Sequence, residues 1–358
     1  EITHDGGANT VEIRTIGSAE GFISNVSVIE VTDDTDLPRI NYTDGEGSLL
    51  LEPQSTNLVT YSEDFSQWSG NEITTQTGFL APDGSNNAIK ITSTGSQSYF
   101  VLSGLNLTGT DTRTIYAKTV SGTGTVNLCS YGQNTNNNFT ITPQWQRFEV
   151  NGTTTATGEP NFYGVDFRFA EANPLSELII WGAQAEALSY ATSYIPTNGS
   201  TVTRLADVCN NSGNSDLINS TEGVLYAEIS ALSNDGNYKA ITLSDGTVNN
   251  QVLLALGNSD NTITWEIRSN NITSVFTSYS QNILQFNKIA IKFKTNDFAL
   301  WLNGNEVMVD NIGSAPTGMN VLDFQRGDNT LDFYGNVKCV AVFKEALSDT
   351  ELEKLTTI

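Results

Sequence analysis

Hydrophobic and polar residues alternate along most of this chain in short runs separated by Gly, Asn and Asp. The clearest case is the segment 288–307, KIAIKFKTNDFALWLNGNEV, in which large apolar residues recur at every second position on both sides of Asn296-Asp297. A period of two is that of a strand with one buried face, and Asn-Asp and Asn-Gly pairs favour tight turns. The segment predicts consecutive β-hairpins, with Trp301 on the face opposite to Leu300 and Leu302.

One segment departs from this pattern. Residues 346–355, ALSDTELEKL, place Ser348 three positions before Glu351 and bring Leu352 and Leu355 onto one helical face. Ser and Glu at this spacing form a capping box at the start of a helix. The chain is therefore predicted to be all-β, with one short C-terminal helical turn.

Apolar strands and polar connections divide the chain into modules. The strand Leu178–Trp181 runs into a small-residue tail and then a Tyr-Ile-Pro exit at 194–196, which closes one β-domain, and GVLYAEISAL opens the next. A chain of 358 residues is long enough for two or three domains, each with its own core. We expect one sandwich over 58–200, a linker over 201–221 and a second sandwich over 222–358.

The N-terminal part of the chain shows the same order of an apolar strand followed by a Pro-containing segment. The strand GFISNVSVIEV (21–31) and the LPRI tract after it repeat the order of strand and Pro-containing exit found at 178–197. This weak internal repeat predicts that residues 1–36 are the C-terminal strands of a preceding β-module. Residues 37–57 are then a connector into the first full sandwich.

Charge narrows the range of partners. The chain has 40 acidic and 17 basic residues, a net charge of −23, so nucleic acid and anionic membrane surfaces are disfavoured. The sequence contains no run of about 18 apolar residues, so we expect no membrane insertion. The acidity serves solubility and also leaves carboxylates that could bind calcium.

The sequence contains few of the residues that catalytic sites commonly use. His4 is the only histidine, and the three cysteines, Cys129, Cys209 and Cys339, are scattered. A His-rich zinc site cannot be assembled, and a Ser-His-Asp or Cys-His mechanism would have to use His4. The sequence shows no P-loop and no dinucleotide fingerprint, and the acidic residues of 222–358 are dispersed. We therefore expect a protein that is not an enzyme.

Binding of a saccharide fits the composition better. Sugars are recognised by aromatic ring faces together with amides and carboxylates that bind hydroxyl groups. Two loop segments of the first sandwich, 130–139 and 161–169, combine these groups. The predicted sugar face consists of Tyr131, Gln133, Asn134, Tyr163, Asp166 and Arg168.

The remaining aromatic residues are divided between core and ligand roles. Trp68 follows a turn, where it is either a plug at the module edge or a ligand platform, and Tyr238 and Trp265 are candidates on the second sandwich. Trp145 and Trp181 lie in apolar strands and are predicted as core residues. Flexible polar loops without a ligand remain the alternative for all the loop candidates.

Two tracts carry a family resemblance: PRINYTDGEGSLLLEPQSTNLVTYSEDFSQW (38–68) and ELIIWGAQAEALSYATSYIPTNGSTVTRLAD (177–207). Together they resemble a module arrangement of bacteriophage tail fibres, tail spikes and related secreted bacterial proteins. In that arrangement a jelly-roll similar to carbohydrate-binding modules precedes a concanavalin A-like, laminin-G-like sandwich. The tracts TIYAKTVSG (114–122) and QWQRFEV (144–150) and the hairpin segment 288–307 add to the resemblance.

The resemblance implies a non-catalytic, lectin-like receptor-binding part of a tail fibre or spike that attaches to a host surface polysaccharide. The protein would then be located in the virion, or be extracellular or cell-surface bound, with other tail or fibre subunits as partners and a homo-trimer as its assembly. It also implies a structural calcium ion near Glu63 and Asp64, although Trp181-Gly182 stands where many relatives place an Asp. Two alternatives stay open: an accessory carbohydrate-binding region of a secreted polysaccharide-degrading enzyme, and a purely structural fibre or filament segment.

Overall fold

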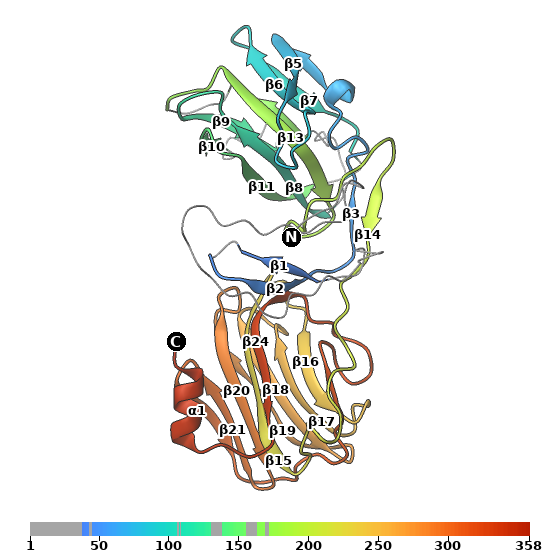
Figure 1. Ribbon diagram of the computed structural model, residues 1–358, viewed down its shortest axis with the longest axis vertical. Coiled ribbons are helices and arrows are strands. Elements are labelled where there is room, and N and C mark those ends of the chain that lie inside the picture. The colour runs from blue at the N-terminus through green and yellow to red at the C-terminus, as the bar shows by residue number, and fades with distance from the viewer. Residues whose placement is uncertain are drawn as a thin grey trace, which may run out of the picture. The chain divides into compact units, whose positions relative to one another are not determined.

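The computed structural model describes residues 38–42, 45–105, 107, 109–129, 138–154, 163–168 and 172–358. These residues form two β-sandwiches and one short C-terminal α-helix (Figure 1). The predicted fold class, an all-β chain with a jelly-roll and a concanavalin A-like sandwich, is confirmed. No helix among the described residues is long and apolar enough to cross a membrane.

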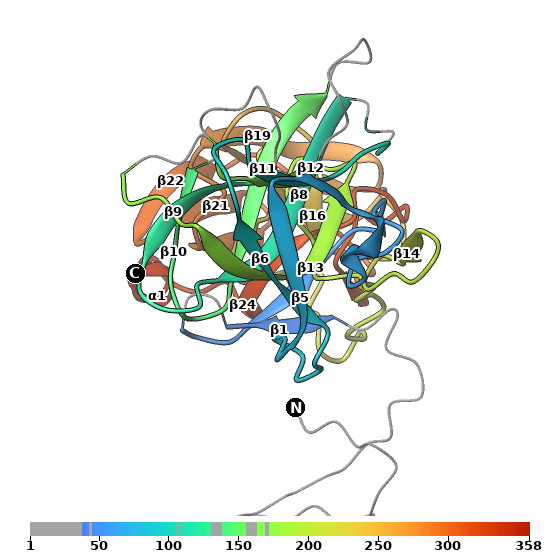
Figure 2. The ribbon, with the colours of Figure 1, turned by 90° about the horizontal axis from the view of Figure 1, so that it is seen from above.

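The jelly-roll consists of two five-stranded antiparallel sheets, and its strands β5, β6, β13 and β8 lie next to one another in one of them (Figure 2). That sheet has the order β11 (Gln146–Thr154), β8 (Gly109–Lys118), β13 (Glu177–Glu186), β6 (Ala88–Ser93), β5 (Ile73–Phe79). The other has the order β10 (Asn138–Ile141), β9 (Gly124–Leu128), β12 (Tyr163–Asp166), β7 (Tyr99–Leu102), β4 (Ser69–Asn71).

The core of the jelly-roll lies between these sheets. Ile115, Leu178 and Ile180 reach it from one sheet, and Val126 and Leu128 reach it from the other. Each of these side chains is essentially removed from water. Because side chains alternate along a strand, the residues between them point to the opposite face of the sheet. That face of the β8–β13 sheet carries the candidate site described below.

The second sandwich pairs a seven-stranded sheet with a five-stranded sheet around a core that includes Leu225, Ile291, Leu254 and Trp265. The larger sheet has the order β1 (Arg39–Asn41), β2 (Ser48–Leu51), β24 (Gly335–Phe343), β15 (Glu222–Ala231), β20 (Asn287–Lys294), β21 (Asp297–Leu302), β22 (Asn305–Asp310). The smaller has the order β19 (Ile272–Ser280), β18 (Thr262–Ser269), β17 (Gln251–Leu256), β16 (Lys239–Ser244), β23 (Val321–Asp323).

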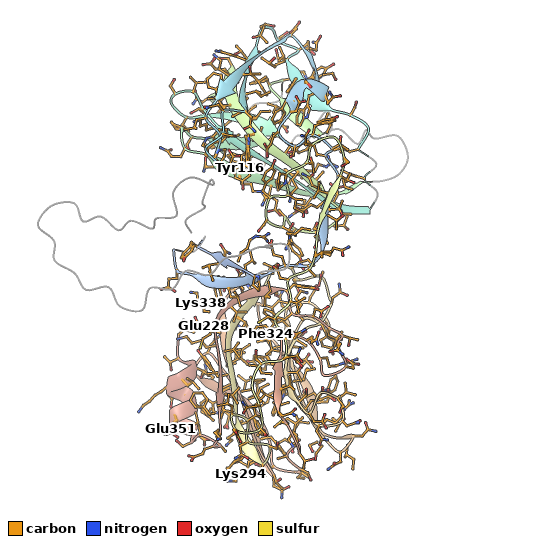
Figure 3. All side chains as sticks on the ribbon, turned by 45° about the vertical axis from the view of Figure 1, so that its right-hand side comes forward. Tyr116, Glu228, Lys294, Phe324, Lys338 and Glu351 are labelled. Carbon is orange, nitrogen blue, oxygen red and sulfur yellow. The ribbon has the colours of Figure 1, made fainter. Side chains whose placement is uncertain are left out.

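The hairpin and helix predicted from the sequence both form. Residues 288–307 lie in β20, β21 and β22, with Trp301 on the face away from the main core. Helix α1 (Asp349–Thr356) packs Leu352 against that same outer cluster. The backbone N–H of Ser348 donates to Oε2 of Glu351 over 2.9 Å, as the capping box requires. Figure 3 shows Glu351 on helix α1.

The segment before the jelly-roll belongs to the second sandwich. β2 pairs with β24 through Leu49 and Val337, and β1 continues the sheet beyond β2. The jelly-roll is therefore inserted between β2 and β15 of the other sandwich. Residues 37–57 were expected to be a connector, but local patterning cannot reveal a strand partner nearly 300 positions away. Residues 1–36, expected to be strands of a preceding module, lie outside the described residues.

The two crossings between the sandwiches pair with each other. β3 (Ser55–Asn57) leads into the jelly-roll and β14 (Val202–Arg204) leads out of it, and the two strands are antiparallel partners. Part of the segment 201–221, expected to be a linker, therefore forms a strand.

Candidate functional site

Two aromatic residues of the predicted sugar face lie in the jelly-roll core. Trp68 is 7% exposed, and its ring centroid lies 5.0 Å from that of Phe65 and 5.3 Å from that of Tyr163. Tyr163 is fully buried, and its hydroxyl donates to the carbonyl oxygen of Thr114. Neither ring offers a face to a ligand, so of the two roles considered for Trp68 the structure supports the plug.

The other predicted residues of the first sandwich are separated from these rings or lie outside the described residues. Asp166 is fully buried and binds Arg168, with 2.6 Å between Oδ2 and Nη2. The Arg168 guanidinium in turn lies 4.8 Å from the centroid of the Tyr99 ring. These two residues therefore have a structural role near the end of β12. The remaining three, Tyr131, Gln133 and Asn134, fall outside the described residues.

On the second sandwich, Trp265 and Tyr238 lie on opposite sides of the five-stranded sheet. Trp265 is 1% exposed and belongs to the main core, because it points inward from β18. Tyr238 packs on the outer face of this sheet, against a cluster that includes Ala240 and Leu253. Trp265 is thus unavailable for stacking, whereas Tyr238 borders an outer surface.

The predicted calcium ligands are engaged in hydrogen bonds. The Glu63 carboxylate accepts from Asn87 Nδ2 over 2.7 Å and from the Tyr194 hydroxyl over 3.0 Å. Asp64 accepts from the backbone of Ser66 and caps the short 3₁₀ helix η1 (Phe65–Gln67). The described residues bring no group of three or more His, Cys, Asp or Glu together for a metal ion. A calcium ion at Glu63 and Asp64 stays a prediction.

A different set of aromatic residues gathers on the outer face of the jelly-roll. We call this set the aromatic face, and its members are Tyr116 on β8, Trp181 on β13, Trp145 just before β11 and Tyr194 after β13. Tyr116 and Trp181 are direct cross-strand partners, and their neighbours Ile115, Ala117 and Ile180 point into the core. Figure 3 shows Tyr116 on the jelly-roll. The aromatic face is therefore a product of strand alternation.

The rings of the aromatic face contact one another. Trp181 lies 4.7 Å from Tyr194 and 5.4 Å from Tyr116 between ring centroids, in tilted and edge-on arrangements that aromatic pairs favour. Trp181 is 4% exposed, and its Nε1 donates to Asn87 Oδ1 over 2.8 Å. Tyr116, Trp145 and Tyr194 are only half-buried. Trp181 is thus the base for the rings of Tyr116 and Tyr194, and Trp145 packs against the same cluster.

Gly182 allows these rings to approach the strand. Its φ of +64° lies in the left-handed region, and it sits where the pairing register of β13 with β8 shifts. A Cβ atom at this position would lie 3.0 Å from Tyr116 and 3.3 Å from Tyr194. Glycine is therefore needed both for the backbone conformation and for the space.

Two cations border the aromatic face. Lys118 Nζ lies 4.9 Å from the centroid of the Trp145 ring, and the Arg147 guanidinium lies 5.7 Å from that of Tyr116. Arg147 donates to the carbonyl of Thr192 and to the hydroxyl of Thr114. Neither cation forms an ion pair with a carboxylate of the described residues. At the Tyr194 side of the aromatic face the nearest charged group is instead the Glu63 carboxylate, which is hydrogen-bonded to the Tyr194 hydroxyl.

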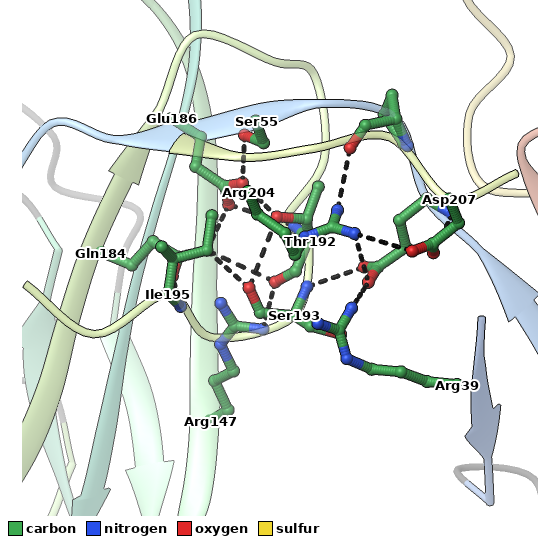
Figure 4. Close-up of polar contacts among 12 residues, drawn as sticks. Arg39, Ser55, Arg147, Gln184, Glu186, Thr192, Ser193, Ile195, Arg204 and Asp207 are labelled. Carbon is green, nitrogen blue, oxygen red and sulfur yellow. Dashed lines mark hydrogen bonds and ion pairs between the residues drawn. The ribbon is translucent and has the colours of Figure 1, made fainter. Parts of the chain in front are cut away.

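A buried carboxylate, that of Glu186, fixes the backbone segment that leads to Tyr194. Glu186 is fully buried and accepts hydrogen bonds from Ser55 Oγ over 2.6 Å and from Gln184 Nε2 over 2.7 Å (Figure 4). The same carboxylate accepts from the backbone N–H of Thr192, two residues before Tyr194. Burial raises the pKa of Tyr194, so its hydroxyl stays protonated and donates to Glu63. The position of the Tyr194 ring is thus fixed by the bond from the Thr192 backbone to Glu186 and by the bond from its own hydroxyl to Glu63.

A second buried carboxylate continues this network towards β1. Glu52 accepts from the backbone of Ser193 over 2.7 Å and from Arg39 Nη1 over 2.8 Å (Figure 4). Arg204 lies 3.6 Å from Glu52 and 3.4 Å from Asp207. Burial raises the pKa of Asp207, which nevertheless accepts the backbone N–H of Glu52. Two arginines and two carboxylates thus anchor the strand crossings next to the aromatic face.

Sequence reasoning predicted Trp145 and Trp181 as core residues; Trp181 is buried as predicted, but in a separate cluster on the outer face of the sheet, and Trp145 is only half-buried there. The signal was present in Leu178–Trp181, because strict alternation puts Leu178 and Ile180 on one face and Ile179 and Trp181 on the other. The same rule applied to Tyr116, between Ile115 and Ala117, places it beside Trp181. The contribution of Tyr194 could not be found, since it depends on the path of a loop.

No protein-family model and no curated protein sequence matches the chain. Among solved structures it is similar to the CBM40 of the Ruminococcus gnavus IT-sialidase, with 16% identity, a TM-score of 0.35, and coverage of 42% of this chain and 94% of that one. Domain 4 of AbnA, an extracellular arabinanase of Geobacillus stearothermophilus, has 15% identity, a TM-score of 0.32, and coverage of 47% and 81%. Sheep galectin-11 has 12% identity, a TM-score of 0.27, and coverage of 38% and 99%. Each likeness covers less than half of this chain.

Proposed function

We propose that this chain is a non-catalytic glycan-binding protein and that the aromatic face of the jelly-roll binds the glycan. The observation that supports this most strongly is the grouping of three half-buried rings, Tyr116, Trp145 and Tyr194, beside two cations without a carboxylate partner among the described residues. Ring faces and edges suit the C–H surfaces of a pyranose, and fixed cations orient its polar groups.

The charges favour a glycan that carries acidic groups. A net charge of −23 repels anionic ligands, so only a local positive surface can accept them. Lys118 and Arg147 supply such a surface, whereas Arg113 and Arg168 are each paired with a neighbouring aspartate. An acidic sugar on the aromatic face would place its carboxylate by Lys118 while its ring lies against Trp145.

The biological setting belongs to the same proposal. The chain is the receptor-binding part of a phage tail fibre or spike, located in the virion, and it attaches the virion to a host surface polysaccharide together with other fibre subunits. The resemblance of the tracts 38–68 and 177–207 to such proteins supports this setting. Specific binding of the purified chain to bacterial cells, competed by their isolated surface polysaccharide, is the expected result, and binding that the polysaccharide does not compete would contradict it.

A glycan array tests the function. The full chain is applied in calcium and again in chelator, next to the variants Trp145→Ala and Tyr42→Ala. Tyr42 is 69% exposed, follows β1 of the second sandwich and is not a member of the aromatic face, so it is a matched aromatic control. We expect acidic glycans to retain the wild type and Tyr42→Ala but not Trp145→Ala. Absence of any retained glycan, with the protein folded, overturns the proposal, and loss of binding in chelator alone would support the predicted calcium ion.

A further inference from the structure

Strand β19 forms one edge of the five-stranded sheet in the second sandwich, where its strand partner is β18. Within the described part of the chain, the backbone of residues 275–280 makes no hydrogen bond to any element other than β18. Alternate residues of such an edge point their N–H and C=O groups away from the sheet. We call the backbone of residues 275–280 the open edge.

Both ends of the open edge are defined by contacts with other segments. The pairing register with β18 skips Ser274, which is the extra residue of a β-bulge. The Ser274 hydroxyl donates to the carbonyl oxygen of Ser314 and accepts from the Ser314 N–H, both over 3.1 Å. At the other end, the backbone N–H of Gln281 donates to the carbonyl oxygen of Asn261. Between these contacts, about 20 Å of strand is free to pair, at the usual rise per residue.

The open edge lacks the charged residues that usually protect an edge strand. The segment 269–287 contains no charged residue and no proline, although 16% of the chain is charged. Charged side chains and prolines on an edge prevent it from pairing with another strand. Strand β22, at one edge of the larger sheet, has this protection, because it carries Glu306 and Asp310. The bulge at Ser274 shields only the start of β19.

Exposed apolar side chains accompany the open edge. Val275 packs in the core, so Phe276 points outward, where it is 59% exposed. Ile272 at the start of β19 and Ile312 in the loop after β22 are exposed as well. Strand β5 of the jelly-roll is also an uncharged edge, but it has no exposed large apolar residue and a register shift interrupts it. Free backbone, absence of charge and exposed apolar groups therefore coincide at β19.

These properties select the kind of partner. A free edge is complementary to another extended strand. Copies of a chain with a net charge of −23 repel each other, and an uncharged edge lets two copies approach at the lowest electrostatic cost. Antiparallel pairing about a two-fold axis makes the edge complementary to itself, since outward side chains of one copy then meet outward side chains of the other. A basic partner would instead be attracted to the acidic surfaces of the chain.

We propose that the open edge is the dimer interface of this protein. Two copies pair their β19 strands antiparallel and join their five-stranded sheets into one continuous sheet. This pairing forms about six hydrogen bonds between the copies and covers both Phe276 side chains. A dimer carries two aromatic faces, which raises its affinity for a polysaccharide with repeated units. The dimer itself does not depend on the proposed function.

Sedimentation velocity of the full chain tests the dimer, over a range of about 1–100 µM because a short interface is expected to be weak. The variant Phe276→Glu places a carboxylate beside the open edge of each copy. Val309→Glu is the matched control, because Val309 is 51% exposed on β22 and the substitution adds the same charge. Hydrogen exchange of the wild type at the two ends of this range reports on the amides of 275–280 without any substitution.

We expect the wild type and Val309→Glu to dimerise as the concentration rises. Phe276→Glu should raise the dimer dissociation constant at least about tenfold, because like charges that face each other across an interface are costly. Exchange of the 275–280 amides should be slower in the dimer. A chain that stays monomeric, or one that forms a trimer, would overturn the proposal. So would a dimer that Phe276→Glu does not weaken or that leaves the exchange of these amides unchanged. The glycan array tests the aromatic face separately, so failure of the dimer leaves the proposed function standing.

Discussion

The ammonium of Lys118 lies 4.9 Å from the centroid of the Trp145 ring, on the outer face of the jelly-roll. Lys118 is on β8 and Trp145 precedes β11, which is hydrogen-bonded to β8, so the pair is fixed by the sheet. A cation above an indole is attracted by the ring with about 0.5–1 kcal/mol at an exposed site. Charge and ring are therefore presented together, and a ligand that contacts one meets the other.

The conformation of Gly182 should be essential for the aromatic face. Gly182→Ala forces a side chain into the left-handed region at φ +64° and brings Cβ to 3.0 Å from Tyr116. We expect a loss of about 1–3 kcal/mol in the free energy of unfolding, measured by chemical denaturation. Gly152→Ala is the control, because its nearest atom would be 3.8 Å away. Equal stability of both variants would contradict the strained geometry.

Replacing Trp68 or Trp145 with alanine should have very different effects on stability, because only Trp68 is predicted to be needed for the core. Trp68→Ala removes a ring that packs among Phe65, Phe100 and Tyr163, so it should cost about 3–5 kcal/mol in unfolding free energy. Trp145→Ala truncates a half-buried ring and should cost much less. Thermal unfolding measures both. A Trp68→Ala protein as stable as Trp145→Ala would show that Trp68 is not a core residue.

The arginines around Glu52 should differ in importance. Arg204→Met leaves Asp207 without its described ion-pair partner and Glu52 with Arg39 alone, so we expect a loss of about 3 kcal/mol. Arg39→Met should cost about 1 kcal/mol or less, since the Arg39 side chain is 37% exposed while that of Arg204 is 6% exposed. Urea denaturation of the two variants checks this order, and a reversed order would contradict the network.

Acid should weaken the Arg326–Asp328 pair. The hydrogen bond from Arg326 lowers the pKa of Asp328 to about 2, below its value of about 3.9 in an unfolded chain. A lowered folded-state pKa stabilises the fold above about pH 4, and this stabilisation is lost as the pH falls through 2. The difference in melting temperature between wild type and Asp328→Asn should therefore shrink from pH 5 to pH 2. A constant difference would contradict the pairing.

Local patterns predicted much of the fold. The alternation around Trp301 and the spacing of Ser348 and Glu351 were sufficient because both features depend on neighbouring residues. The pairing of β2 with β24 was not predictable in this way, since it joins segments that are distant in sequence.

The candidate site was harder to predict than the fold. Residues such as Tyr163 and Trp265 have the right chemistry for sugars, but their position on a strand turns them into the core. Tyr116 shows the reverse case, because it lies in an apolar strand and yet is half-buried on the outer face of the sheet. Residue type gives the chemistry that is available, and the facing of each strand decides whether a ligand can reach it.

Titration calorimetry of the array-selected acidic glycan into the full chain tests the central claim most directly. The proteins are the wild type, Trp145→Ala and Tyr42→Ala. We predict that Trp145→Ala weakens Kd at least tenfold, about 1.4 kcal/mol or more, and that Tyr42→Ala leaves it unchanged. The same Kd for all three proteins would contradict a glycan site on the aromatic face.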